Sequence, residues 1–160
     1  MFKFGTIGAF KQVGNNPRTK AVIDTKNGYV VIPDDVTGLS PTPATPTIAQ
    51  SKDVYVAMNI IDKPEIRNSS DFYIAKDEHI RAFKLTDLAD KLCDFSYDIV
   101  KNDYASVALN SYLVPCDDAT DPDHKGKWKV STDTDYNVRI QILEKTTYGD
   151  KGFHGKVVVK

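Results

Sequence analysis

Hydrophobic and polar residues alternate along most of the chain after residue 52, with turn-forming residues between the runs. In residues 138–145, three aliphatic side chains alternate with Arg139 and Gln141. A period of two is typical of an antiparallel strand with one buried and one wet face. The pattern predicts strands at residues 54–61, 72–74, 79–85, 112–114, 127–130, 136–145 and 153–159. So many short strands predict a mainly β main domain over residues 52–160, an antiparallel barrel or a sandwich.

A helical period interrupts this pattern in residues 85–92, where the spacing of the leucines places them near one face. Thr86 can cap such a helix, and Asp87 favours the positive end of its dipole. We predict one or two helical turns here, and a second short helix at residues 105–110 from a weaker signal.

Two apolar runs, residues 21–24 and 29–32, flank the turn-forming pair Asn27 and Gly28. Asn-Gly supplies the positive backbone angles that a tight turn requires, so residues 20–37 predict a β-hairpin. The following residues 38–51 contain Pro41, Pro43 and Pro46. This spacing favours extended chain and excludes helix, and it predicts a linker or long surface loop, or less often a ligand for a proline-binding groove.

The first 19 residues predict an extended arm, because their apolar residues have no regular period and glycines interrupt them. Such a segment needs a surface to dock on. It can pack back on its own domain or remain loose, or it can dock on a neighbouring subunit.

Composition narrows the functional classes. Lys and Arg number 21 against 22 Asp and Glu, so the net charge of −1 argues against a specific nucleic-acid partner. No apolar run approaches the roughly 20 residues of a membrane helix, and the start has no signal-peptide stretch. We therefore expect a soluble protein made in the cytosol. Cys93 and Cys116 are the only cysteines and form no CxxC, which favours two reduced structural thiols.

Candidate catalytic and metal-binding residues do not form a known motif. His79, His124 and His154 stand far apart, and no hydrolase signature surrounds either cysteine. The acidic stretch from Asp117 to His124 could hold a hard cation, but it lacks the glycine and distal Glu of an EF-hand loop. A solvated hairpin loop is the preferred interpretation, and we predict no catalytic residue, no cofactor and no metal.

Four segments give the chain its resemblance to a known family: residues 4–10 (FGTIGAF), 59–65 (NIIDKPE), 80–85 (IRAFKL) and 143–149 (LEKTTYG). Their order resembles capsid decoration or auxiliary proteins of tailed bacteriophages. The resemblance implies a β-barrel, β-tulip-like or sandwich domain on the capsid surface, with an N-terminal arm that staples neighbouring capsid subunits. The chain is longer than the smallest decoration proteins and carries the additional proline-rich segment.

The resemblance also implies a function. It predicts a non-enzymatic virion protein on the capsid surface, made in the host cytoplasm, with the major capsid protein as its partner. Homo-oligomers, for which a trimer is one arrangement, are expected. The residues expected to bind the partner are Phe2, Phe4, Ile7, Phe10 and Arg18. The alternatives are a tail tube or head-tail connector subunit, a small metal-dependent hydrolase using the loop from Asp117 to His124, and a nucleic-acid module.

Overall fold

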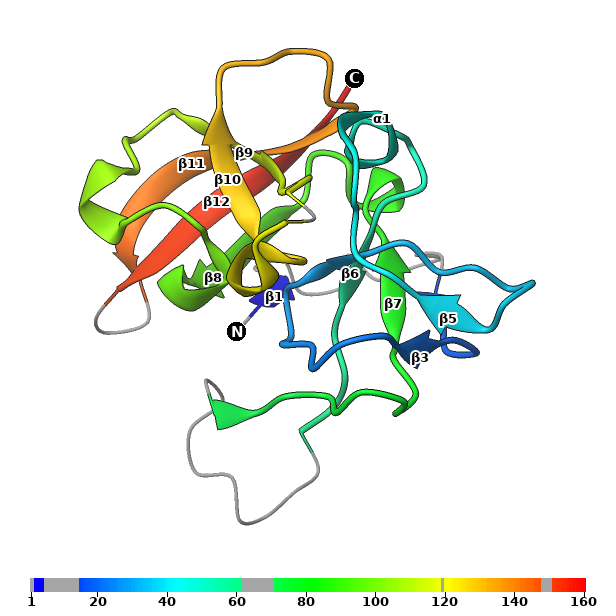
Figure 1. Cartoon of the computed structure of the whole chain (residues 1–160). Coiled ribbons are helices and arrows are strands. Elements are labelled where there is room, and N and C mark those ends of the chain that lie inside the picture. Colours follow the sequence, from blue (N-terminus) through cyan, green and yellow to red (C-terminus); the bar gives the residue numbers. More distant parts are fainter. Residues whose placement is uncertain (1, 5–14, 62–70, 119, 148–150) are drawn as a thin grey trace.

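The computed structural model describes residues 2–4, 15–61, 71–118, 120–147 and 151–160, and within these it is a mainly β, sandwich-like fold (Figure 1). Its six-stranded antiparallel sheet has the order β1-β8-β12-β11-β9-β10. The strands are β1 (Phe2–Phe4), β8 (Leu92–Ser96), β9 (Tyr112–Pro115), β10 (Trp128–Ser131), β11 (Val138–Thr147) and β12 (Gly152–Val159).

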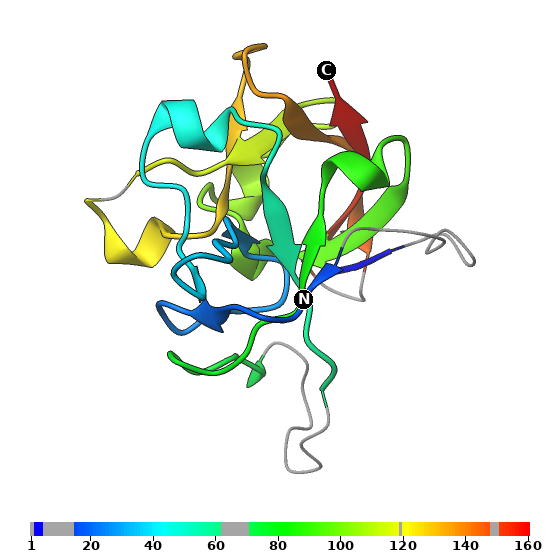
Figure 2. The same cartoon turned by 90° about the vertical axis from the view of Figure 1, so that its right-hand side faces the viewer.

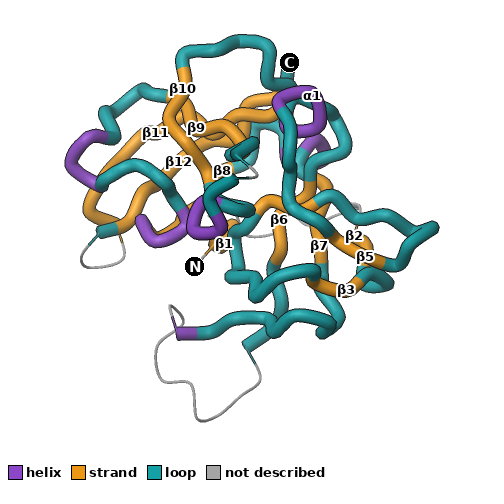
Figure 3. Tube along the Cα trace, in the orientation of Figure 1, coloured by secondary structure: helices purple, strands orange, loops and turns teal. Residues whose placement is uncertain are grey.

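A smaller four-stranded antiparallel sheet has the order β2-β7-β6-β4. Its strands are β2 (Asn15–Asn16), β4 (Val30–Val31), β6 (Tyr55–Ala57) and β7 (Ala82–Lys84). A parallel pair, β3 (Lys20–Ala21) with β5 (Leu39–Ser40), lies beside it. Figure 2 shows β6 and β7 side by side, and Figure 3 shows how much loop surrounds these short strands. The described strands form no closed barrel, because β1 and β10 are separate edges of the large sheet.

The main core lies between the two sheets. Val138, Ile140 and Ile142 of β11 point into it, as their alternation predicts, and none of the three is exposed. Trp128 is also fully buried there, and its indole N–H donates to the carbonyl oxygen of Gly28 at 2.9 Å. This bond joins the large sheet to the turn that precedes β4.

The small sheet is buried on both faces. Val30, Val56 and Phe83 belong to the main core, whereas their neighbours Val31, Ala57 and Ala82 belong to a second core completed by Ala21, Phe72, Ile74 and Ile80. Successive residues of a strand point to opposite faces, so a strand buried on both sides is apolar throughout and does not alternate.

The predicted hairpin of residues 20–37 is wrong, although its turn exists: the N–H of Tyr29 donates to the Lys26 carbonyl at 3.0 Å. The strand after the turn pairs with β6, and β3 pairs with β5. Asn27 is the physical reason. Its side-chain amide exchanges two hydrogen bonds of 2.8 Å with the backbone of Asn59, which draws the turn onto the end of β6.

The proline-rich segment is more ordered than a linker. It contains β5 and a short helix α1 (Pro46–Ala49), because proline is well tolerated in the first helical turn and Thr45 accepts a hydrogen bond from the N–H of Ile48. Ala49 is fully buried against Val114 on the outer face of β9 and against Tyr136. The expectation that this segment excludes helix is therefore wrong.

The helix expected at residues 86–92 is shortened to the 3₁₀-helix η2 (Thr86–Leu88), and Thr86 makes no capping bond. Asp90 then adopts a positive φ of 63°, and β8 begins at Leu92. The sequence pattern missed β8, although Cys93 and Phe95 alternate there with partly exposed residues. Of the second predicted helix, residues 105–110, only residues 105–106 are helical, at the end of the 3₁₀-helix η4 (Tyr104–Ser106).

Candidate functional site

The N-terminal residues expected to bind a partner have different positions in the structure. Phe2 is 2% exposed and stacks on Phe95 at a centroid distance of 6.2 Å, so it fills the protein's own core and not a partner's groove. β1 pairs with β8, which buries its first residue. The backbone of Phe4 pairs opposite Cys93. Ile7 and Phe10 lie outside the described residues, and Arg18 is exposed.

Three of the four acids of the predicted cation loop, Asp117, Asp118 and Asp121, are paired with neighbouring side chains or backbone groups. Asp118 accepts hydrogen bonds from the backbone N–H (3.0 Å) and hydroxyl (2.6 Å) of Thr120, which lower its pKa. Asp121 caps the 3₁₀-helix η5 (Pro122–His124) through the N–H of Asp123 and lies 2.9 Å from Nδ1 of His124. Across the described part of the chain, no three His, Cys, Asp or Glu side chains gather as a metal site.

Asp117, the first acid of this loop, belongs to a structural cluster. It accepts hydrogen bonds from the ammonium group of Lys129 and from the hydroxyl of Tyr136, the latter at 3.0 Å. Burial alone would raise the pKa of Asp117, but these two bonds outweigh it and lower the pKa. Through Asp117, these two bonds link Tyr136 to Lys129 on the outer face of β10.

The surroundings of His79, His154 and Cys93 are those of structural residues and do not indicate a catalytic role. Nδ1 of His154 lies 2.6 Å from Asp94 across β12 and β8, and His79 is exposed. Cys93 is fully buried, and burial raises the pKa of its thiol far above the usual value. A thiol held in its protonated form is a poor nucleophile.

A projecting loop, residues 34–39, extends from the fold just before β5 (Figure 1). It presents the most exposed large apolar side chain of the described chain. Val36 at its tip is 96% exposed, and Leu39 at its base is 39% exposed. Asp34 organises the loop: its carboxylate accepts from the N–H of Val36 and the hydroxyl of Thr37, at 2.9 and 2.8 Å. These bonds lower the pKa of Asp34.

The backbone also fixes the projecting loop. Asp34 and Leu39 form an antiparallel bridge, and Gly38 takes a positive φ of 70°. Beyond the loop, Asn16 of β2 donates to the carboxylate of Asp35 at 2.9 Å. The backbone beneath the apolar tip is thus fixed by contacts within the protein itself.

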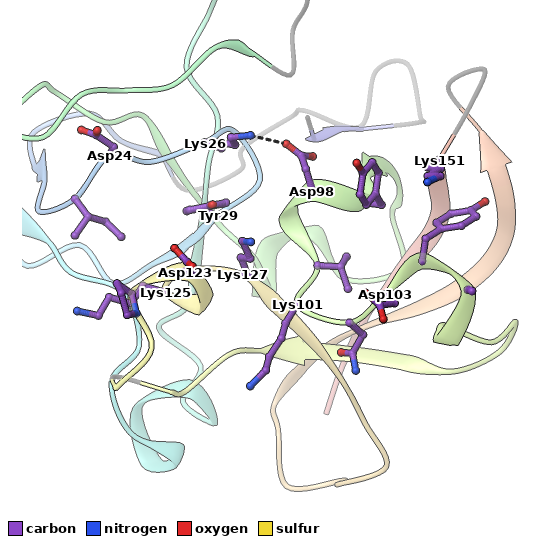
Figure 4. Close-up of a pocket in the computed structure, with 17 residues that line it drawn as sticks. Asp24, Lys26, Tyr29, Asp98, Lys101, Asp103, Asp123, Lys125, Lys127 and Lys151 are labelled. Atoms are coloured by element: carbon purple, nitrogen blue, oxygen red, sulfur yellow. Dashed lines mark hydrogen bonds and ion pairs between the residues drawn. The ribbon is translucent and has the colours of Figure 1, made fainter.

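An open hollow of about 1000 Å³ lies on another part of the surface (Figure 4). Four segments remote in sequence build it: residues 23–29, residues 97–105, residues 122–127 and Lys151. Its charged lining consists of Lys26, Lys101, Lys125, Lys127 and Lys151 with Asp24, Asp98, Asp103 and Asp123.

Tyr29 lies in the middle of this hollow, between the ion pair of Lys26 with Asp98 (2.9 Å) and Asp123 (Figure 4). Burial, and then the negative charges of Asp98 and Asp123, raise the pKa of Tyr29. Gly126 allows the chain to pass close to the Tyr29 ring, because a Cβ atom there would stand 2.8 Å from Tyr29 Cδ2.

Sequence reasoning missed both surfaces. The projecting loop carries a signal that could have been used, an Asp followed by a Gly four residues later. The hollow has no local signal, because only the tertiary fold brings its four segments together.

Comparison with protein-family models, with curated proteins and with solved structures gives no significant match. Within the described residues, no helix has the length and apolar character needed to cross a membrane.

Proposed function

We propose that this protein is a non-enzymatic component of a phage particle that binds the outer surface of the capsid and stabilises contacts between major capsid subunits. The observation that carries the proposal is the projecting loop, which holds Val36 at 96% exposure in a fixed conformation. The resemblance of the sequence to capsid auxiliary proteins supplies the partner.

A fixed loop suits this role for an energetic reason. Association costs conformational entropy when a segment must be ordered on binding, and a preorganised segment avoids much of that cost. The loop also carries Asp34 and Asp35 beside its apolar tip. We therefore expect the capsid contact to be an apolar socket with basic residues at its rim.

Stabilisation requires no chemistry. A ligand that binds only the assembled lattice adds its binding free energy to the stability of that lattice. Phe2 is occupied in the core and cannot contribute to the contact, so the projecting loop carries the proposal. Deleting residues 1–19 would remove β1 from the large sheet, so truncation is a poor test of binding.

The test is co-sedimentation of the purified protein with assembled capsids, compared with Val36→Asp. Val36 makes little contact with its own fold, so the variant should fold normally and bind at least about tenfold more weakly. Leu109→Asp is the matched control, because Leu109 is also exposed (55%) but lies outside the projecting loop. Equal binding by wild type and Val36→Asp would remove the loop from the proposal.

Light scattering of the free protein tests the proposal at a second point. A small homo-oligomer or monomer that sediments saturably with capsids is the expected result. Rings or tubes formed without capsids, together with no capsid binding, would replace the proposal with a tail tube or connector subunit.

A further inference from the structure

The hollow around Tyr29 is separate from the projecting loop, and the proposed capsid binding does not use it. Two of its four segments are fixed by backbone hydrogen bonds that involve residues outside the lining, and a third bond joins Tyr97 to Lys151 within the lining. The N–H of Lys101 donates to the Trp128 carbonyl at 2.7 Å, the N–H of Val30 donates to the Gly126 carbonyl at 2.7 Å, and the N–H of Tyr97 donates to the Lys151 carbonyl at 3.0 Å. The walls are thus held by the two sheets and persist without a ligand.

The charges of the lining nearly cancel, with five lysines against four aspartates. Lys26 and Asp98 neutralise each other, and Lys101 lies 3.8 Å from Asp118 outside the lining. An anion entering the hollow meets Asp103 and Asp123, and a cation meets Lys125 and Lys127. Neither sign of charge gains a clear advantage there, which favours a ligand without net charge.

Both hydrogen-bond donors and hydrogen-bond acceptors in the lining remain available to such a ligand. Within the described chain, the side chains of Asp123, Lys125 and Lys127 take part in no hydrogen bond or ion pair with the protein. Asn102 uses its oxygen to accept from the N–H of Val130 at 2.8 Å, which leaves its amide hydrogens as donors. Carboxylates only accept, ammonium and amide N–H groups only donate, and a ligand hydroxyl does both.

The hollow also has an aromatic wall. Tyr97 is 45% exposed, and the ammonium group of Lys151 stands 5.4 Å from its ring centroid. Tyr104 is fixed by its packing on Phe153 at a centroid distance of 5.0 Å. The exposed Tyr97 ring offers a flat apolar surface with a polar tip, which complements a molecule whose C–H faces alternate with hydroxyls.

From this combination we propose that the hollow is a binding site for a neutral oligosaccharide, with Tyr97 as the stacking surface and with Asp103, Asp123 and Asn102 as hydroxyl partners. Saccharide rings are the ligands whose apolar faces and closely spaced hydroxyls match both features of the lining. A volume of about 1000 Å³ is at the upper end of ligand pockets, which suits several sugar rings better than one.

The test is a titration of the ¹⁵N-labelled protein with uncharged trisaccharides, namely cellotriose, maltotriose and chitotriose, followed by amide chemical shifts. We expect at least one to shift amides of residues 97–105 and 122–127 saturably. Its affinity should change less than about twofold with added salt, since no ionic contact to the ligand is screened. Trigalacturonate and a peptide of alternating Lys and Glu serve as charged comparison probes.

Two variants locate the site. Tyr97→Ala and the double variant Asp103→Asn, Asp123→Asn should each weaken saccharide binding about tenfold or more, equivalent to the loss of one or two hydrogen bonds or of a stacked face. Tyr73→Ala, at an equally exposed tyrosine (51%) outside the lining, should leave the affinity unchanged. These exposed positions should tolerate substitution, and the amide spectrum reports directly whether each variant is folded.

Three results would overturn the proposal: no saturable shift with any of the three trisaccharides, shifts that Tyr97→Ala and the double variant leave unchanged, or binding of the charged probes alone. The last result would assign the hollow to an ionic ligand or a charged peptide segment. None of these results bears on capsid co-sedimentation, so the two proposals succeed or fail separately.

Discussion

The two sheets reach stability in different ways. In the large sheet, β11 and β12 are neighbours in sequence and pair along most of their length, from Val138 opposite Val159 to Thr147 opposite Gly152. In the small sheet, the strands have two or three residues and come from distant segments. The large sheet is held mainly by continuous backbone pairing, whereas the small sheet depends on side chains such as Asn27 that bond to backbone. A single side chain should therefore matter more for local order in the small sheet.

The largest effect should come from removing the residue that joins the two regions. Trp128→Ala should lower the free energy of unfolding by about 3–5 kcal/mol, because it leaves a cavity and an unpaired Gly28 carbonyl. Trp128→Phe keeps most of the volume and should lose much less. Far-UV circular dichroism during urea unfolding measures both, since Trp128 is the only tryptophan. Equal stability of Trp128→Ala and wild type would contradict the position of this side chain in the core.

A smaller effect is expected where the small sheet meets residues 125–127. Gly126 has a φ of 77° and Gly38 a φ of 70°, but only at Gly126 would a new Cβ meet other atoms. Gly38→Ala should destabilise by about 1 kcal/mol through backbone strain alone. Gly126→Ala adds the clash with Tyr29 and should destabilise by about 2–4 kcal/mol. Urea unfolding followed by Trp128 fluorescence compares the stability of the two variants. Equal losses of stability would mean that the Tyr29 ring moves aside at no cost in free energy.

Next in size is the loss of the Asn27 amide. Asn27→Ala leaves the N–H and carbonyl of Asn59 without these partners and should lower the free energy of unfolding by about 2 kcal/mol. Amide hydrogen exchange should accelerate at Ala57 and Asn59 more than in β11 and β12. Asn16→Ala, which removes an exposed hydrogen bond to Asp35, is the control and should change stability by less than about 0.5 kcal/mol. Uniform acceleration across both sheets would show that the small sheet does not open on its own.

The smallest effect concerns pH. The folded-state pKa of Asp117 lies below its unfolded value of about 3.9, so its contribution is complete above that value and is lost as the pH falls through the folded pKa. Asp117→Asn should destabilise by about 1–2 kcal/mol at neutral pH and lose less stability than wild type on acidification. Exposed Asp71→Asn serves as control. Parallel pH profiles for Asp117→Asn and wild type would refute the linkage.

The contrast between the sheets also explains what the sequence could predict. Alternation at Val138, Ile140 and Ile142 predicted β11 correctly, because a strand with one buried and one exposed face alternates apolar and polar residues. The pairing of β4 could not be inferred from the Asn-Gly turn, since the partner was chosen by Asn27 reaching Asn59, 32 residues away. The mainly β class was therefore predictable, and the strand order was not.

The candidate surfaces also differ in how far the sequence can predict them. Arg18 was expected at the surface and is exposed, whereas Phe2 was expected there and is buried. An apolar residue in an irregular segment gives no sign of whether its own core or another molecule covers it. The hollow depends on four separate segments, so only the fold defines it.

The position of β1 has a consequence for how the chain folds as it leaves the ribosome. Phe2 is synthesised long before Phe95, on which it stacks, and before Phe153, which packs on Phe95; β8 lies between β1 and β12. The large sheet cannot be completed until β12, near the end of the described chain, has emerged. During translation the Phe2 ring stays exposed to water or to chaperones, and folding should be slow compared with a protein of local contacts.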